Sequence, residues 1–374
     1  MLRFLGGKFH NKQTMGREQQ IRFCTSADGT RLAVATLGEG LPLVRAATWL
    51  THVEREPTNL FARHWVAELS RHNTLVRYDS RGCGMSDRDV ERISMEAWLE
   101  DLEAVVSELS VESFSLFGMS QGAAIAVNYA ARHPDKVSRL ILYGGCARGL
   151  LKRDPPPKAV EAAQAMLKAA EMGWGADSSS FRQVFISQLF HDATVEQQRA
   201  VDEAQRLTIS GANAARFMKE VFEIDVRGAA PKVRCPTLVF HAKDDPCFPL
   251  EEGRLLASLI PNARFVPLAS KNHLPFETEA AWPAFLSELR AFLPSSAPGS
   301  RVQDAGAKAK RPLTPRQIEI LREVGFGQTD KQIARKLSLS PRTVEMHVAN
   351  ALLALNCRTR AEAVRRATEL KLTD

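Results

Sequence analysis

The stretch that decides the fold is FSLFGMSQGAAIAVNYAARHP, residues 114–134. It opens with a short apolar run of the kind found in buried parallel strands and continues with the apolar spacing of a helix. Between the two parts stands Gly118-Met119-Ser120-Gln121-Gly122. A serine between two glycines at a strand-to-helix turn is typical of a nucleophile elbow, whose sharp turn exposes the serine oxygen. The pattern therefore predicts that Ser120 is a nucleophile and that the backbone N–H of Gln121 faces a developing oxyanion.

Two later segments supply partners for this serine, because a serine hydroxyl is a weak nucleophile until a base removes its proton. Residues 237–249, TLVFHAKDDPCFP, contain a strand followed by two acidic residues, and residues 263–276, ARFVPLASKNHLPF, contain a strand followed by His273. The order Ser, Asp, His is the order of a serine-hydrolase triad on an α/β sheet. We predict that His273 is the base and that Asp245 orients it, with the adjacent Asp244 as the alternative.

Short apolar runs alternate with helical patterns through the first 293 residues, which predicts an open, mostly parallel α/β sheet with helices on both faces. A hairpin with Asp28-Gly29 at its turn precedes this alternation. Residues 148–228 interrupt it with helical patterns and a run of prolines at 155–157, so we expect a helical lid over the carboxyl edge of the sheet. The strand-like runs are 43–49, 74–79, 114–118, 139–145, 237–242 and 263–268.

Large apolar residues of this lid segment have two interpretations. Such residues more often form the core of the lid. The second interpretation is that some of them line a ligand cavity beneath the lid. They are Met166, Met172, Trp174, Phe181, Phe185, Met218 and Phe222.

The whole excess of positive charge lies near the C-terminus. Residues 301–374 contain 15 Lys and Arg against 8 Asp and Glu, whereas residues 1–300 contain 35 of each, and the chain as a whole carries +7. A neutral body with a short basic module suggests a catalytic or sensing part joined to a part that binds a polyanion. Residues 294–311 are rich in Pro, Ser, Gly and Ala and have the composition of a flexible linker. The expected parts are a flexible extension (1–19), an α/β domain (20–293), this linker and a basic helical domain (312–374).

Several classes of protein do not fit the composition. No apolar run approaches the ~20 residues of a membrane-spanning helix, so we expect no membrane association. The six cysteines form no C-x-x-C pair and no Cys/His cluster with zinc spacing. We therefore expect reduced thiols in the cytoplasm, no metal and no cofactor.

The basic module repeats one signal for the start of a helix. Thr314, Thr329 and Thr359 each begin an S/T-x-x-E/Q capping box, and Ser340-Pro341 marks a fourth start. The pattern predicts four short helices, two of which are joined by a brief turn as in a helix-turn-helix.

Residues 20–293 resemble the α/β-hydrolase fold family. The resemblance rests on the elbow, on the acid and histidine segments, and on YDSRGCGMSD at 78–87, where Asp79, Arg81, Gly82, Gly84 and Ser86 match the family's turn after its fourth strand. It implies a Ser120–Asp245–His273 triad. Family members commonly carry His-Gly where this chain reads LVRAATWLTH, so the second oxyanion donor is expected to be a backbone N–H near Thr48 or Trp49.

Residues 312–370 resemble the LuxR-type helix-turn-helix domain. Matching positions include Leu313-Thr314-Pro315-Arg316, Ile333-Ala334, Ser340, Thr343-Val344 and His347. The resemblance implies a bacterial transcription regulator that binds duplex DNA as a homodimer, with a recognition helix from about Pro341 to Leu355. The residues expected to face the major groove are Arg342, Thr343, Met346, His347 and Asn350, and those expected at phosphates are Lys331, Gln332 and Arg335.

Together these patterns predict a DNA-binding transcriptional regulator whose α/β-hydrolase-like domain senses or hydrolyses a small carbonyl compound. One alternative is a serine hydrolase for an ester or lactone with an accessory helical module. Another is a catalytically inactive ligand sensor.

Overall fold

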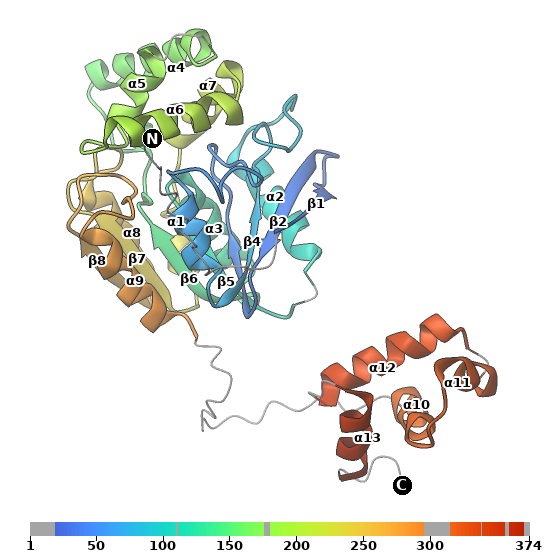
Figure 1. The fold of residues 1–374 in the computed structure, drawn as a ribbon. Helices are drawn as coiled ribbons and strands as arrows, with labels where there is room; N and C mark the ends of the chain where they lie inside the picture. Colours follow the sequence, from blue (N-terminus) through green and yellow to red (C-terminus); the bar gives the residue numbers. More distant parts are fainter. Residues whose placement is uncertain are drawn as a thin grey trace, which may run out of the picture. The chain divides into compact units, whose positions relative to one another are not determined.

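The structure is a computed structural model that describes residues 19–109, 111–175, 180–294, 315–337, 339–355 and 359–369. The chain divides into two compact units, Met1–Pro298 and Gly299–Asp374. Figure 1 shows the helices and strands of both units.

The first unit is built on an eight-stranded sheet with the order β1-β2-β4-β3-β5-β6-β7-β8. The first two strands form an antiparallel hairpin, β2 pairs antiparallel with β4, and every later pairing is parallel. The central strands are buried on both faces, which explains their continuous apolar sequence. The strands are β1 (Gln20–Thr25), β2 (Arg31–Leu37), β3 (Leu41–Arg45), β4 (Asn73–Tyr78), β5 (Phe114–Met119), β6 (Val137–Tyr143), β7 (Thr237–Ala242) and β8 (Ala263–Leu268).

Helices cover both faces of this sheet, as the alternation predicted (Figure 1). On one face, α2 (Met95–Ser107) packs against α3 (Gln121–Arg132), and α8 (Leu250–Leu259) packs on β7 and β8. On the other face lie α1 (Arg63–Leu69) and α9 (Ala281–Phe292), joined by contacts of Trp65 with Trp282 and Phe285. The sheet therefore holds the carboxyl ends of its parallel strands in fixed register at one edge.

One predicted strand is shorter than expected. The run at 43–49 was expected to be strand throughout, but β3 ends at Arg45. The following residues form a loop that passes close to the start of α3, since a Cβ on Gly122 would lie 3.0 Å from the carbonyl oxygen of Ala46. This change of direction brings Thr48 and Trp49 to the carboxyl edge of the sheet, next to Ser120.

Helices also fill the segment between β6 and β7, above the carboxyl edge of the sheet (Figure 1). We call residues 148–228 the insertion. Its core is aromatic: Trp174 is fully buried, donates from Nε1 to the carbonyl of Gln205 (3.2 Å), and contacts the rings of Trp49 and Phe185. The elements are η1 (Leu150–Lys152), α4 (Pro157–Gly173), α5 (Ser180–Ser187), α6 (Val195–Thr208) and α7 (Gly211–Phe222), with η2 (Ala230–Lys232) following.

The second unit contains α10 (Pro315–Gly325), α11 (Asp330–Lys336), α12 (Pro341–Leu355) and α13 (Arg360–Glu369). Thr329 and Gln332 form the predicted capping box, and the hydroxyls of Ser340 and Thr359 accept hydrogen bonds from the amides three residues on. The capping prediction at Thr314 falls outside the described residues. The apolar faces meet in two small clusters, one around Ile333 and Val344 and one around Leu321 and Ala363.

Across the described residues, no helix has both the length and the apolar character needed to cross a membrane. The described cysteines are all free thiols, and the described His, Cys, Asp and Glu side chains form no cluster suited to a metal ion.

Candidate active site

Ser120 lies in a strained turn between β5 and α3. Its backbone has φ 51° and ψ −130°, a conformation that costs energy for a residue with a side chain, and its N–H donates to the carbonyl of Tyr143 (2.8 Å). The two flanking glycines are required by close packing. A Cβ on Gly118 would lie 2.7 Å from the carbonyl oxygen of Gly122, and one on Gly122 would press on the loop after β3. The turn thus has the geometry of the predicted elbow.

His273 and Asp245 meet after β8 and β7. Nδ1 of His273 lies 2.8 Å from Oδ2 of Asp245, and the other carboxylate oxygen accepts the N–H groups of Cys247 and Phe248. Both side chains are fully buried, whereas Asp244 is exposed. The hydrogen bond to the carboxylate places the imidazole proton on Nδ1 and leaves Nε2 as the basic nitrogen. This Nε2 is buried and has no hydrogen-bond partner among the described residues. His273 lines the same small cavity as Ser120.

The pKa of Asp245 is held below its usual value. Burial alone would raise it, but the electrostatic interaction and hydrogen bond with His273, the neighbouring His241 and the backbone N–H of Phe248 outweigh burial. His241 was not singled out by its sequence, yet its Nε2 lies 3.5 Å from Asp245 Oδ2 and 2.9 Å from the carbonyl of Phe248. Burial lowers the pKa of His241 despite Asp245, so this imidazole is neutral near pH 7 and braces the loop. The only sequence signal for His241 is its position, four residues before Asp245.

The residues of the two expected oxyanion donors, Gln121 and Trp49, line one cavity together with Ser120. Gln121 is the first residue of α3, where the helix N-terminus adds positive potential. Trp49 lines both cavities that contain Ser120, and its backbone N–H has no hydrogen-bond acceptor among the described residues. Its ring is fixed by Trp174, Phe185 and Phe217 of the insertion. The insertion therefore helps to place the loop on which the second donor is expected.

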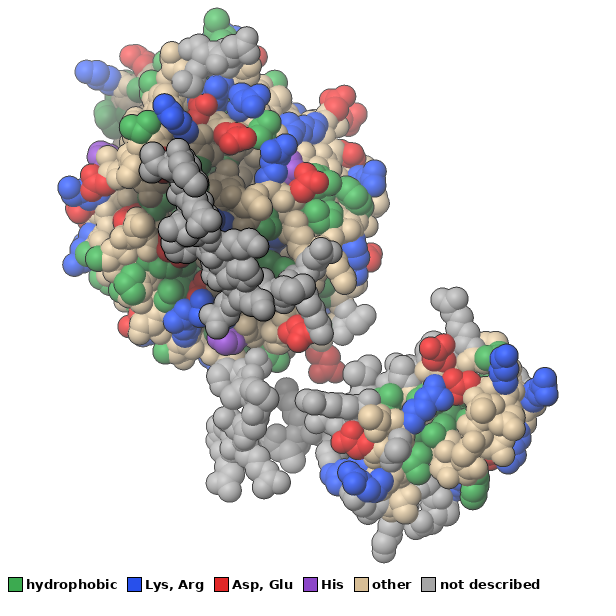
Figure 2. Space-filling view, viewed as in Figure 1, with side chains coloured by type: hydrophobic (Ala, Val, Ile, Leu, Met, Phe, Trp, Pro, Cys, Tyr) green, Lys and Arg blue, Asp and Glu red, His purple; other side chains and the backbone are tan. Residues whose placement is uncertain are grey.

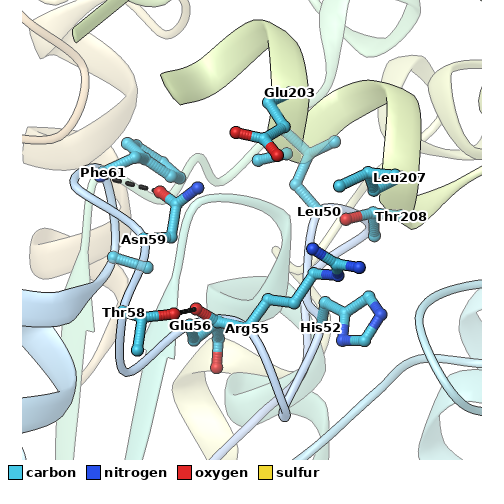
Figure 3. Close-up of a pocket in the computed structure, with 12 residues that line it drawn as sticks. Leu50, His52, Arg55, Glu56, Thr58, Asn59, Phe61, Glu203, Leu207 and Thr208 are labelled. Atoms are coloured by element: carbon cyan, nitrogen blue, oxygen red, sulfur yellow. Dashed lines mark hydrogen bonds between the residues drawn. The ribbon is translucent and has the colours of Figure 1, made fainter. Parts of the chain in front are cut away.

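Three adjoining cavities lie around this site, and Ser120 lines two of them. An outer cavity of about 150 Å³ is lined by His52, Arg55 and Asn59 from the loop before α1, facing Glu203 of α6 (Figure 3). It shares Leu50, Glu56, Phe61 and Ala62 with a cavity of about 50 Å³ that contains Ser120 and His273. The third cavity, of about 300 Å³, lies beneath the insertion and shares Trp49, Ser120 and Leu189 with the second. Ser120 thus stands at the junction of a small polar approach and a larger apolar chamber.

A network of buried ion pairs supports the wall that the 150 Å³ and 50 Å³ cavities share at Glu56. The Glu56 carboxylate accepts from Arg45 (2.6 Å) and from Arg77, and Arg77 also donates to Gln19 (2.6 Å). Burial opposes the charge on Glu56, but the two guanidinium groups hold the pKa of this carboxyl below its usual value. The network keeps a charged carboxylate at the cavity wall without leaving it unpaired.

The described part of the second unit presents the helices of a helix-turn-helix. Lys331 and Arg335 of α11 are exposed, while Thr343 and His347 of α12 are half-buried. Gln332 is exposed, but its side-chain oxygen accepts from the backbone and hydroxyl of Thr329. Figure 2 shows Lys and Arg side chains at the surface of this unit. The side chains of Arg342, Met346 and Asn350, also expected at the groove, lie outside the described residues.

Comparison with known families places both units. The family model for the alpha/beta hydrolase fold matches residues 57–280, and the model for bacterial regulatory proteins of the luxR family matches residues 311–367. The chain is 27% identical over 251 residues to the AB hydrolase superfamily protein YisY of Bacillus subtilis (66% of this chain, 90% of that protein). It is 27% identical over 247 residues to the pimeloyl-[acyl-carrier protein] methyl ester esterase of Chromobacterium violaceum (66% of this chain, 92% of that protein).

Solved structures show the same fold. An esterase from Exiguobacterium antarcticum superposes with a TM-score of 0.62 at 24% identity, over 72% of this chain and 98% of that one. The enol-lactonase from Burkholderia xenovorans LB400 superposes with a TM-score of 0.60 at 23% identity, over 72% of this chain and 99% of that one. With the elbow, the sheet order and the helical second unit, these matches show that the chain belongs to the alpha/beta hydrolase fold family and carries a LuxR-type DNA-binding domain at its C-terminal side.

Proposed function

We propose that the protein is a DNA-binding transcriptional regulator whose first unit binds and hydrolyses a small ester or lactone. The observation that carries the enzymatic part is the contact of His273 Nδ1 with Asp245 at 2.8 Å, beside a serine held at φ 51°. The regulatory part is supported by the LuxR-type match at residues 311–367. The names of the relatives, which include an esterase and an enol-lactonase, support a carbonyl substrate.

In the proposed reaction, Ser120 Oγ attacks the substrate carbonyl while Nε2 of His273 takes the hydroxyl proton. The carbonyl π electrons move onto oxygen, and the resulting oxyanion is stabilised by the backbone N–H groups of Gln121 and Trp49. The intermediate then expels the alcohol, which receives the proton from His273 and leaves an acyl-Ser120. A water molecule, deprotonated by His273, attacks this acyl group and releases the acid. Asp245 keeps its negative charge and stabilises the imidazolium in both halves of the reaction.

The second unit is proposed to bind duplex DNA with α12 in the major groove. Lys331 and Arg335 of the preceding helix are exposed and are proposed to contact phosphates, with Gln332 beside them. Thr343 and His347 of α12 are proposed to contact base edges, together with Arg342, Met346 and Asn350. We further propose that the protein binds DNA as a homodimer through its last helix, with the cytoplasm as its compartment.

The experiment that tests this function measures both activities on the same full-length preparation. Duplexes selected from a random pool are titrated with protein at low and at moderate salt, and hydrolysis is followed with short-chain p-nitrophenyl esters and with lactones. We expect duplex binding that strengthens as salt falls, because phosphate contacts release counterions. We also expect ester or lactone turnover in the wild type.

Ser120→Ala and Arg335→Glu separate the two parts of the proposal. Ser120→Ala should lose turnover and keep DNA binding, and Arg335→Glu should weaken DNA binding. Turnover that survives Ser120→Ala contradicts the proposed nucleophile, and an absence of salt-dependent duplex binding contradicts the regulatory role. A wild type that binds DNA but turns over no ester would instead support the inactive-sensor alternative.

A further inference from the structure

The cavity beneath the insertion has a volume of about 300 Å³ and a mostly apolar lining. Apart from backbone groups and Ser120, it is walled mainly by Ala, Met, Phe and Val side chains from α4, α5 and α7, together with Leu150 of η1, Leu189 and Phe248. Besides the Ser120 hydroxyl and the Cys247 thiol, three lining side chains are polar or charged, namely Gln121, Gln188 and Arg153, and only Arg153 carries a charge. A small-molecule site is commonly an apolar cavity with a few placed polar groups that fix orientation.

Arg153 follows η1 at the edge of the insertion and has unused donors. Its Nε donates to the carbonyl of Arg148 (2.9 Å), and its guanidinium carbon lies 5.9 Å from the centre of the Phe248 ring. The nearby buried carboxylate of Glu252 already accepts three hydrogen bonds from Arg148, at 2.8, 3.2 and 2.8 Å, and lies 4.0 Å from Arg153. Two guanidinium groups therefore share one carboxylate. Within the described residues, the Nη groups of Arg153 have no acceptor.

Gln121 gives a second, independent indication of a ligand. Its side chain is 1% exposed and lines the insertion cavity, yet neither its amide oxygen nor its amide nitrogen has a hydrogen-bond partner in the described structure. A buried amide without partners costs a few kcal/mol relative to water. A polar group of a bound molecule, placed next to Ser120, would remove that cost.

We propose that the insertion cavity binds an acyl chain that ends in a carboxylate. The reacting carbonyl lies at Ser120 with a polar group in contact with the Gln121 amide, the methylene chain lies along the apolar walls, and the distal carboxylate pairs with Arg153. A guanidinium beside an apolar wall suits a carboxylate because it offers two parallel donors. This inference rests on the proposed function, since it names the substrate class of the same site.

The test compares two ester series on the full-length protein. One series contains mono-p-nitrophenyl esters of straight-chain dicarboxylic acids, and the other contains p-nitrophenyl esters of the monocarboxylic acids of equal length. The readout is the ratio of kcat/KM for the anionic ester to kcat/KM for the neutral ester at each length. We expect Arg153→Met to lower this ratio about 10- to 100-fold at the preferred length, as expected for a lost charged hydrogen bond, and Arg153→Lys to lower it less.

Lys152→Met is the matched control. Lys152 is the preceding residue, has the same sign of charge, and pairs with Glu223 at the surface, outside the cavity lining. The ratio of kcat/KM for the anionic and neutral esters in Lys152→Met should equal that of the wild type. A wild-type ratio in Arg153→Met, or an equal fall in both variants, would overturn the inference, because either result removes the specific pairing with Arg153.

A binding measurement separates failure of the inference from failure of the proposed function. Ser120→Ala is titrated with the mono-N-methylamide of octanedioic acid and with N-methyloctanamide, and the same titration is repeated with Arg153→Met added. Tighter binding of the anionic amide that disappears with Arg153→Met supports the inference even if no ester is hydrolysed. Equal binding of both amides contradicts it, whatever the esterase assay shows.

Discussion

At the scale of single residues, the neighbouring carboxylates Asp244 and Asp245 have opposite environments. Asp245 is buried, accepts two backbone N–H groups and faces His273, whereas Asp244 is exposed. Sequence reasoning favoured Asp245 but left Asp244 open, because adjacent residues share every local signal. The difference arises in the turn after β7, where the Asp245 side chain faces His273 and the Asp244 side chain faces solvent.

This contrast gives a prediction with an internal control. Asp245→Asn should lower the kcat of ester hydrolysis about 10³- to 10⁴-fold, because an amide cannot hold His273 in the required tautomer or stabilise its charged form. Asp244→Asn should leave kcat within about twofold. Steady-state rates with one activated ester decide the matter, and equal rates in the two variants would remove Asp245 from the mechanism.

Asp79 leads to a prediction about how the stability of the first unit depends on pH. It is buried after β4 and accepts the N–H groups of Val53 and Met85, both at 2.8 Å. Burial raises its pKa to about 7, above the ordinary 3.8, although those hydrogen bonds oppose the shift. The folded state therefore holds a proton between pH 4 and 7 that the unfolded chain releases. This group alone should make stability fall as pH rises through that window, by up to about 1.4 kcal/mol per pH unit.

Thermal unfolding at several pH values between 4 and 8 tests whether stability falls as pH rises. All five tryptophans lie in the first unit, so tryptophan emission reports on that unit alone. In Asp79→Asn the decline of stability with rising pH should be shallower than in the wild type, whereas exposed Asp89→Asn should follow the wild type. An unchanged slope in Asp79→Asn would show that this carboxyl does not titrate in the window.

Among the elements, the strand, the tight turn at Ser120 and the following helix agree with the sequence prediction, whereas the surroundings of this turn could not be predicted. Gly118, Ser120 and Gly122 encode strand, turn and helix locally. The unpartnered amide of Gln121 and the position of Arg153 instead depend on the insertion folding back over the sheet. Contacts between segments that lie far apart in the chain leave no local pattern.

The ring of Trp174 in the insertion contacts the ring of Trp49 in the loop after β3. This contact predicts that a substitution in the insertion affects both stability and catalysis. Trp174→Ala should lower the unfolding free energy of the first unit by about 3–5 kcal/mol, because it empties a fully buried site. It should also lower kcat/KM, since Trp174 packs on Trp49 (ring centres 5.3 Å apart), whose N–H is the proposed oxyanion donor.

Met172→Ala is the control for that substitution, because Met172 lies on the same helix but is 74% exposed. Its stability and activity should match those of the wild type. Circular dichroism with denaturant measures the first quantity and ester hydrolysis the second. Wild-type activity in Trp174→Ala would show that the insertion does not help to place the donor.

In the whole molecule, the net positive charge is concentrated in the part of the chain that is proposed to bind DNA. The part up to residue 300 is neutral, and the remaining residues carry the whole net charge of +7. Removing one phosphate contact should reduce the slope of log K against log salt by about 0.9. We expect that reduction for Lys331→Ala in the second unit and no change for Arg254→Ala, an exposed cation on α8 of the first unit. Equal slopes for both variants would contradict the proposed phosphate contact of Lys331.

The proposed function depends above all on Ser120 being a nucleophile that His273 activates. Labelling of the full-length protein with a fluorophosphonate probe, followed by mass spectrometry of the modified peptide, tests it most directly. We expect one adduct on Ser120 in the wild type, and none in Ser120→Ala or His273→Ala under the same conditions. An unlabelled wild type, or an adduct that persists when His273 is replaced, would contradict it.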